Sequence, residues 1–169
     1  MTAKRMIEEQ RTLYASPLLL GKGFAVRVHT AHNRRFGLLN GTKLPDRIML
    51  DIDPGYSFGE GTHPTTQLCA EALERWVRPG TAVLDIGCGT GILSVLAARL
   101  GADRVAAADI SPEAVKAARH NAALNGVQDR VFVRESDLTE AVDGTFDLAA
   151  ANILADPLLR LVCLFQEQS

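Results

Sequence analysis

Residues 83–91 read Val-Leu-Asp-Ile-Gly-Cys-Gly-Thr-Gly. The apolar run from Ala82 to Ile86 predicts a short buried strand, and the apolar residues after Gly91 recur at helical spacing until Gly101 ends the pattern. Glycines at a strand-to-helix turn let backbone N–H groups approach a ligand, because a Cβ would block the approach. The stretch therefore predicts an α/β domain with a ligand site at the carboxyl end of its first strand.

The same strand-and-helix unit is repeated further along the chain. Apolar runs over 105–108, 131–133 and 146–151 predict three more strands. Ser111-Pro112 predicts the start of one intervening helix, and Asp156-Pro157 predicts the start of a last helix. Alternating strands and helices predict an α/β fold with a doubly wound, mostly parallel sheet, whose ligand lies beyond the carboxyl ends of the strands.

A segment with a different pattern precedes this domain. Alternating apolar residues between Gly23 and Asp53 predict short antiparallel strands joined by turns. A loop rich in turn formers follows over 53–63, and Pro64 suits the first position of a helix. That helix carries an apolar stripe of five residues, Leu68, Cys69, Ala72, Leu73 and Trp76. We therefore expect an N-terminal extension over 1–60, which includes a loop over the ligand, and a ligand-binding domain over 61–169.

The composition excludes several classes of protein. The 169 residues are 47% hydrophobic and 22% charged, which rules out disordered and collagen-like chains and fits one domain with a short extension. The net charge of −2 argues against bulk electrostatic binding of nucleic acid but leaves room for a local basic patch. No direct, sequence-specific nucleic-acid partner is expected. Cys69, Cys88 and Cys163 are too widely spaced for a disulfide framework or a thiolate zinc site, and no metal is expected. No apolar run approaches the ~20 residues of a membrane span, and we expect a cytoplasmic protein.

Acidic residues near the glycines narrow the choice of ligand. Asp109 ends the second strand of the domain, where a carboxylate can accept both hydroxyl groups of a ribose. A dinucleotide fingerprint needs glycine at position 92, which is Ile92 here, and the charge of Asp85 would repel a pyrophosphate. A carboxylate at this position suits instead the amino group and the sulfonium of S-adenosylmethionine. The alternative reading is a tight strand-to-helix turn in another kind of α/β domain.

The run from Asp85 to Gly91 resembles motif I of the Rossmann-like class I methyltransferases. The resemblance implies that S-adenosylmethionine is the cofactor, and that five residues of this region bind it: Asp85, Gly87, Gly89, Gly91 and Asp109.

Two polar residues follow later strands of the domain. Asp137 comes after the third strand, where the methyltransferase fold contacts the edge of the adenine; a helix cap or a solvated loop acid explains this residue equally well. Asn152 ends the fourth strand and presents a donor and an acceptor to a ligand amine, unless it is an ordinary turn residue.

Four segments narrow the resemblance to one family. They are 58–66 (Phe-Gly-Glu-Gly-Thr-His-Pro-Thr-Thr), 84–93, 108–114 and 152–154 (Asn-Ile-Leu). Together they are similar to the bacterial methyltransferases of ribosomal protein L11, over roughly positions 47 to 160. The resemblance implies that Thr66, Gly87, Asp109 and Asn152 hold the cofactor, and that Phe58 and Thr62 form a lid over it.

The resemblance also implies a reaction, the transfer of a methyl group to lysine ε-amino and N-terminal α-amino groups of a ribosomal protein. Amide and base methyltransferases carry Asn-Pro-Pro followed by an aromatic residue at this site, where flat rings hold a planar nitrogen. Ile153-Leu154 offers no ring, which favours an aliphatic amine. We expect Asn152 to orient the amine as the catalytic residue, with proximity supplying most of the rate. His63 is expected to have a structural role.

The sequence provides fewer strands than the family has. A complete class I methyltransferase sheet has seven strands and four are predicted here, so we expect a fold truncated after the fourth strand and the following helix. The strand over 146–151 then forms an unpaired edge, which invites a homodimer across it. Two further functions stay open: a catalytically silent module that binds S-adenosylmethionine, and a small-molecule amine methyltransferase.

Overall fold

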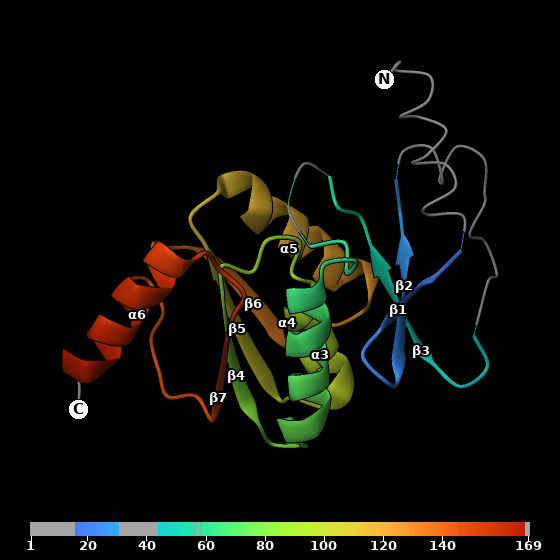
Figure 1. The fold of residues 1–169 in the computed structure, drawn as a ribbon, viewed down its shortest axis with the longest axis horizontal. Coiled ribbons are helices and arrows are strands. Elements are labelled where there is room, and N and C mark those ends of the chain that lie inside the picture. The colour runs from blue at the N-terminus through green and yellow to red at the C-terminus, as the bar shows by residue number, and fades with distance from the viewer. Residues whose placement is uncertain (1–15, 31–43, 56, 58, 168–169) are drawn as a thin grey trace, which may run out of the picture.

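The computed structural model describes residues 16–30, 44–55, 57 and 59–167 of the chain (Figure 1). The smaller of its two sheets contains β1 (Leu18–Leu20), β2 (Phe24–Val28) and β3 (Ile48–Ile52). The larger sheet contains β4 (Ala82–Ile86), β5 (Arg104–Asp109), β6 (Val131–Glu135) and β7 (Leu148–Ala151). The helices are α3 (Pro64–Trp76), α4 (Ile92–Leu100), α5 (Pro112–Leu124) and α6 (Ala155–Glu167).

The four strands of the larger sheet are parallel, in the order β6-β5-β4-β7. Ile86 at the end of β4 lies opposite Ala108 of β5 and Ala151 of β7, so the carboxyl ends of these strands share one edge. The chain winds outward from β4 through β5 to β6 and then returns to the other side of β4. This reversal forms a crevice between neighbouring loops. The predicted doubly wound parallel sheet is therefore confirmed.

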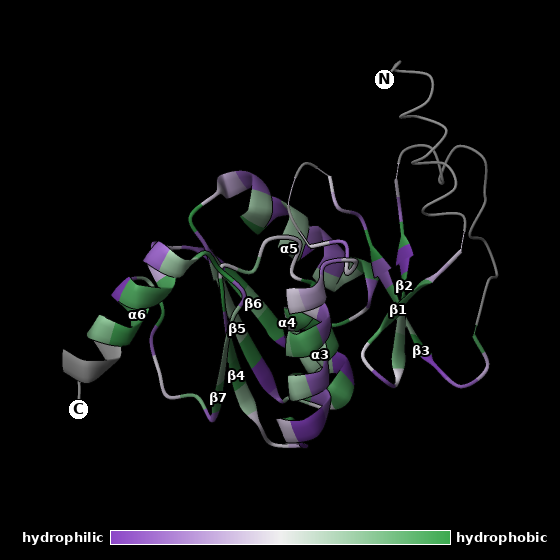
Figure 2. Ribbon diagram, in the orientation of Figure 1, coloured by the Kyte–Doolittle hydropathy of each residue, from purple (hydrophilic) through white to green (hydrophobic). Residues whose placement is uncertain are grey.

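Helices cover both faces of the larger sheet, and the smaller sheet packs beyond α3, α4 and α5 (Figure 1). Side chains of β4 alternate between the two faces: Val83 belongs to the core shared with these helices, whereas Leu84 and Ile86 pack near Leu161 of α6. Most of α4 is buried because it lies between the two sheets. Figure 2 shows hydrophobic residues on α6 as well, on the opposite side of the larger sheet.

The predicted starts and ends of the helices agree with their capping groups. The Ser111 hydroxyl accepts a hydrogen bond from the Ala114 N–H at 3.2 Å, and Pro112 occupies the first turn of α5. His63 caps α3 in the same way through its imidazole. Gly101 ends α4 with φ 108°, a conformation that favours glycine.

The pairing of the small sheet differs in part from the prediction. β1 and β2 are antiparallel, but β2 and β3 are parallel, with Phe24 opposite Ile48, so the expectation of antiparallel strands is wrong for this pair. Parallel neighbours cannot be joined by a tight hairpin turn, and the alternation within each strand does not reveal which of the two pairings forms. A turn expected at Asn40-Gly41 lies outside the described residues. β1 itself was not predicted, because a three-residue strand has no readable period.

The apolar stripe of α3 coincides only in part with its buried face, since Leu73 is the one residue of the stripe that is buried. Leu68 and Trp76 are 67% and 61% exposed, whereas Thr66, Ala70 and Leu73 are buried. Ala70 and Leu73 of α3 belong to the same core cluster as the buried residues of α4. The buried side of α3 therefore includes a threonine and an alanine that the predicted apolar stripe did not contain.

β7 lies at the edge of the larger sheet, with β4 as its only partner among the described strands. It begins at Leu148 rather than at Phe146. Just before it, the Asp147 N–H donates to the Ala82 carbonyl, and the Asp147 carboxylate accepts from the Ala82 N–H. The adjoining start of α6 exposes Leu154 (81%) and Leu159 (66%). No helix in the described part of the chain combines the length and the apolar character needed to cross a membrane.

Candidate functional site

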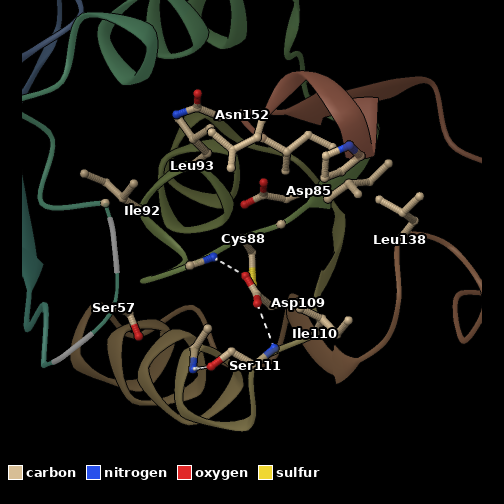
Figure 3. A pocket seen from close by; sticks show the side chains of 18 of the residues that line it. Ser57, Asp85, Cys88, Ile92, Leu93, Asp109, Ile110, Ser111, Leu138 and Asn152 are labelled. Atoms are coloured by element: carbon tan, nitrogen blue, oxygen red, sulfur yellow. Dashed lines mark hydrogen bonds between the residues drawn. The ribbon is translucent and has the colours of Figure 1, made fainter. Parts of the chain in front are cut away.

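A pocket of about 930 Å³ opens at the carboxyl ends of the larger sheet's strands (Figure 3). Its walls come from the turn after β4, the ends of β5 and β7, the loop after β6, the start of α6 and the segment that leads into α3. The structure brings together most of the residues singled out from the sequence, and these line the pocket: Thr66, Asp85, Gly87, Gly89, Asp109, Asp137 and Asn152.

The turn after β4, residues 87–91, is here called the glycine loop. Gly87 has φ +70°, and a Cβ there would lie 2.3 Å from Cγ2 of Ile153, so another residue would adopt a strained backbone conformation and displace the Ile153 side chain. The N–H groups of Gly87 and Cys88 both donate to the Ala108 carbonyl, at 2.8 and 3.0 Å. These bonds fix the loop against the end of β5.

Gly91 occupies a different environment from the other two glycines. It does not line the pocket, and it begins α4 with φ 76°. A Cβ on Gly91 would lie 2.9 Å from the Cβ of Ala118, so its lack of a side chain lets α4 approach α5. The structure therefore assigns Gly91 a packing role beside the site.

Asp85 lies at the base of the pocket. It is fully buried, and its Oδ2 accepts a hydrogen bond from the Ser94 hydroxyl at 2.5 Å. Burial raises the pKa of this carboxyl from 3.8 to about 6; hydrogen bonds from Ser94 oppose the rise, and the charge of Asp109 adds to it. A cationic group in the pocket would favour the ionised form of Asp85.

Asp109 links the end of β5 to two neighbouring segments (Figure 3). Its Oδ2 accepts from the Gly89 N–H and its Oδ1 from the Ser111 N–H, each at 2.9 Å. Each carboxylate oxygen has a second lone pair, so the group can still accept from a pair of ligand hydroxyls. The two backbone bonds set the direction of the carboxylate before any ligand arrives.

Asn152 and Thr66 meet across the pocket from positions 86 residues apart in the chain. The Asn152 Nδ2 donates to the Thr66 Oγ1 at 3.2 Å, and Thr66 is buried on α3. Their contact places an amide and a hydroxyl on the wall that faces the glycine loop. Such a pair can orient a polar group of a ligand.

Asp137 forms an ion pair that the sequence did not reveal. Its Oδ2 lies 2.9 Å from Nη2 of Arg160 on α6, and this carboxylate raises the pKa of Arg160. Both side chains line the pocket. Leu138, the next residue, has φ 52°, an uncommon value for a residue with a side chain, so the chain is constrained where it borders the pocket.

The expected lid is only partly visible. Phe58 lies outside the described residues. Thr62 is exposed and lines a smaller hollow of about 350 Å³ beside the pocket. His63 lines the pocket, but its Nδ1 caps α3 by accepting from the Thr65 N–H at 3.3 Å, which agrees with a structural role.

Cys88 lines the pocket within the glycine loop. Burial, together with the nearby charges of Asp85 and Asp109, raises the pKa of its thiol far above the ordinary value. The thiol therefore stays protonated at neutral pH, and Cys88 is a poor nucleophile.

A parallel sheet with this strand order, a glycine-rich turn after β4 and carboxylates at the ends of β4 and β5 defines a Rossmann-like class I methyltransferase domain. The family model described as Ribosomal protein L11 methyltransferase (PrmA) matches residues 25–168. The chain belongs to this family.

Individual relatives agree with the family assignment. A ribosomal protein L11 methyltransferase of Burkholderia mallei is 52% identical over 114 residues, which cover 68% of this chain and 37% of the relative. One from Desulfitobacterium hafniense is 43% identical over 149 residues, covering 88% of this chain and 45% of the relative. The chain thus spans less than half the length of these two relatives.

Solved structures show the same similarity in three dimensions. A ribosomal protein L11 methylase from Lactobacillus delbrueckii subsp. bulgaricus matches with TM-score 0.77 and 36% identity, over 89% of this chain and 73% of that chain. An RNA methyltransferase from Salinibacter ruber, in complex with S-adenosyl-L-homocysteine, matches with TM-score 0.55 and 29% identity, over 63% of this chain and 71% of that chain.

Proposed function

We propose that the chain binds S-adenosylmethionine and transfers its methyl group to amino groups, of lysine or of the N-terminus, on a ribosomal protein. The observation that carries the proposal is the convergence of Asp85, Asp109, Thr66 and Asn152 on one pocket beside the glycine loop. The names of the relatives support a ribosomal protein as the substrate. Because the chain spans less than half of those relatives, the activity of the complete proteins is a proposal for this one.

The residues of the pocket fit the cofactor. Gly87 provides a backbone surface that a Cβ would obstruct, and Asp109 is oriented to accept from the ribose hydroxyls. Asp85 would offset the positive charge of the methionine end, and Asp137 would face the adenine edge. The RNA methyltransferase from Salinibacter ruber, with S-adenosyl-L-homocysteine bound, supports this assignment. When bound, S-adenosylmethionine supplies an electrophilic methyl group on its sulfonium.

Asn152 is proposed to orient the acceptor amine, and Thr66, whose hydroxyl accepts from the Asn152 amide, to fix that amide as well as to hold the cofactor. An alkylammonium group has a reference pKa of about 10.4 and must lose its proton before it can attack. Exclusion of water favours the neutral amine, and fixed orientation then contributes most of the rate. His63 is engaged in capping α3, so proton transfer to water, rather than to this imidazole, fits the site.

The remaining partners follow from the same proposal. An enzyme that modifies a ribosomal protein would act in the cytoplasm. A second copy could pair along β7, the edge strand, near which Leu159 of α6 and Leu154, the residue before α6, are exposed. Sedimentation analysis tests this homodimer: a species of monomer mass at micromolar concentration would contradict it.

Binding and transfer are tested separately. Calorimetry with S-adenosylhomocysteine should show binding to the wild type and to Asp129→Asn, which changes an exposed carboxylate outside the pocket, but not to Asp109→Ala. Radiolabelled S-adenosylmethionine should then label ribosomal proteins. Binding without labelling would indicate the catalytically silent module, and labelling confined to small amines would indicate a small-molecule methyltransferase. Equal affinity for Asp109→Ala would refute the site.

A further inference from the structure

Thr90 is a buried member of the glycine loop that does not line the pocket. Its hydroxyl donates to the Gly59 carbonyl at 2.5 Å, and its own carbonyl accepts from the Asn121 Nδ2 at 2.9 Å. The pocket residue Gly59 has φ +114°, and a Cβ there would lie 2.7 Å from the Thr90 Oγ1. Thr90 of the glycine loop is thus held by hydrogen bonds to Gly59 and to Asn121.

Asn121, on α5, completes the connection. It has no exposed surface, and its Oδ1 accepts from the Asp53 N–H at 2.8 Å. Its Nδ2 donates to the carbonyls of Asp53 and Thr90, each at 2.9 Å. The side chain amide therefore joins the backbone just after β3 to the backbone of the glycine loop.

Asn125, which follows the last residue of α5 and lies four positions after Asn121, makes a related set of hydrogen bonds. Its Oδ1 accepts from the Asp51 N–H at 2.9 Å, and its Nδ2 donates to the carbonyls of Asp51 at 2.7 Å and Asn121 at 2.8 Å. Asn125 hydrogen bonds to the backbone of Asp51 in β3, as Asn121 does to the backbone of Asp53 just after β3. Unlike Asn121, Asn125 makes no hydrogen bond to the glycine loop. Asn125 is therefore a matched control for the hydrogen bond between Asn121 and Thr90 of the glycine loop.

We propose that Asn121 and Thr90 are positioning residues of the cofactor site, a role that rests on the proposed function. Thr90 follows Gly89, whose N–H meets Asp109, and it bonds to Gly59 on a neighbouring wall of the pocket. By fixing Thr90, Asn121 sets the spacing between these two walls. Without its amide donor, a buried carbonyl loses its partner and the loop shifts to find another.

Two pairs of variants test the proposal by calorimetry with S-adenosylhomocysteine. Asn121→Asp and Thr90→Val remove donors to the loop contacts, and each should weaken binding about tenfold, the usual consequence of losing one buried hydrogen bond. Asn125→Asp removes the donor to the carbonyls of Asp51 and Asn121 but no bond to the glycine loop, and Thr90→Ser keeps the hydroxyl. Both variants should stay within about twofold of wild type. Thermal unfolding should show a larger loss for Asn121→Asp than for Asn125→Asp, because Asn121 has no exposed surface and Asn125 is half-buried. The comparison of Thr90→Val with Thr90→Ser, which introduces no charge, therefore separates the loop contact from stability.

Amide hydrogen exchange provides a readout without ligand. Exchange over residues 87–91 should be faster in Asn121→Asp and Thr90→Val than in Asn125→Asp and Thr90→Ser. If Asn121→Asp does not fold, the two Thr90 variants still decide the outcome. Equal exchange and equal affinity across each pair would overturn the positioning role. If the wild type does not bind S-adenosylhomocysteine, the proposed function fails, while the exchange data still decide how the loop is held.

Discussion

Asp85→Asn should change how the stability of the protein depends on pH. The carboxyl group of Asp85 has a pKa of about 6 in the folded protein, against an ordinary value of 3.8, chiefly because it is buried. Because the pKa of this carboxyl is higher in the folded protein, the unfolded chain releases the proton at a lower pH than the folded protein does. The free energy of unfolding therefore falls as pH rises from 4 to 6. The difference corresponds to about 3 kcal/mol, most of it developed by pH 7. The amide introduced by Asp85→Asn does not titrate in this range.

Urea unfolding of both proteins at pH 4 and pH 7 measures the effect. Relative to wild type, the Asn variant should gain about 2 kcal/mol of unfolding free energy on going from pH 4 to pH 7. The contributions of other titrating groups cancel in this comparison. One of them is Asp51: burial alone would raise the pKa of its carboxyl, but Arg27 and His29 lower it below the ordinary value. A difference between the two proteins that stays constant across this range would refute the assignment of a proton to Asp85.

Three other substitutions have defined outcomes. Gly87→Ala places a Cβ 2.3 Å from Ile153 at φ +70°, and urea unfolding should show a loss of about 2 kcal/mol or more; a loss below about 0.5 kcal/mol would show that Ile153 moves aside freely. Arg160→Gln breaks an exposed ion pair, and the same measurement should change by less than about 0.5 kcal/mol; a larger change would mean the pair supports α6. Thr66→Val should lower kcat for methyl transfer about tenfold, with Thr66→Ser near wild type, and equal rates would remove Thr66 from the acceptor side of the site.

Local patterns are sufficient to predict the larger sheet and much of the pocket. Strand ends and glycine turns are encoded over a few residues, so the sequence alone predicts that Asp85, Gly87 and Asp109 lie at one edge of the sheet, where the pocket is found. Asn152 and Thr66 are predicted separately from two distant motifs, and the fold brings them into contact.

Features that depend on packing at long range could not be predicted in this way. The parallel pairing of β2 and β3 depends on the path of the connecting chain rather than on the alternation of either strand. Arg160 gains its partner only because α6 places it beside Asp137, and a single arginine on a helix carries no such information. The sequence did contain a signal for Asn121: a second asparagine, Asn125, follows four residues later in an alanine-rich segment, which places both on one face of the helix.

The contact between Thr66 and Asn152 also has a consequence for the order of events during synthesis. The two residues are 86 positions apart, so α3 and the glycine loop leave the ribosome well before β7 can join β4. The part of the pocket that surrounds Asp109 can form on the shorter nascent chain, whereas the Asn152 wall must wait for the last strand. A nascent chain is therefore expected to become competent to hold a nucleoside before it can orient an acceptor.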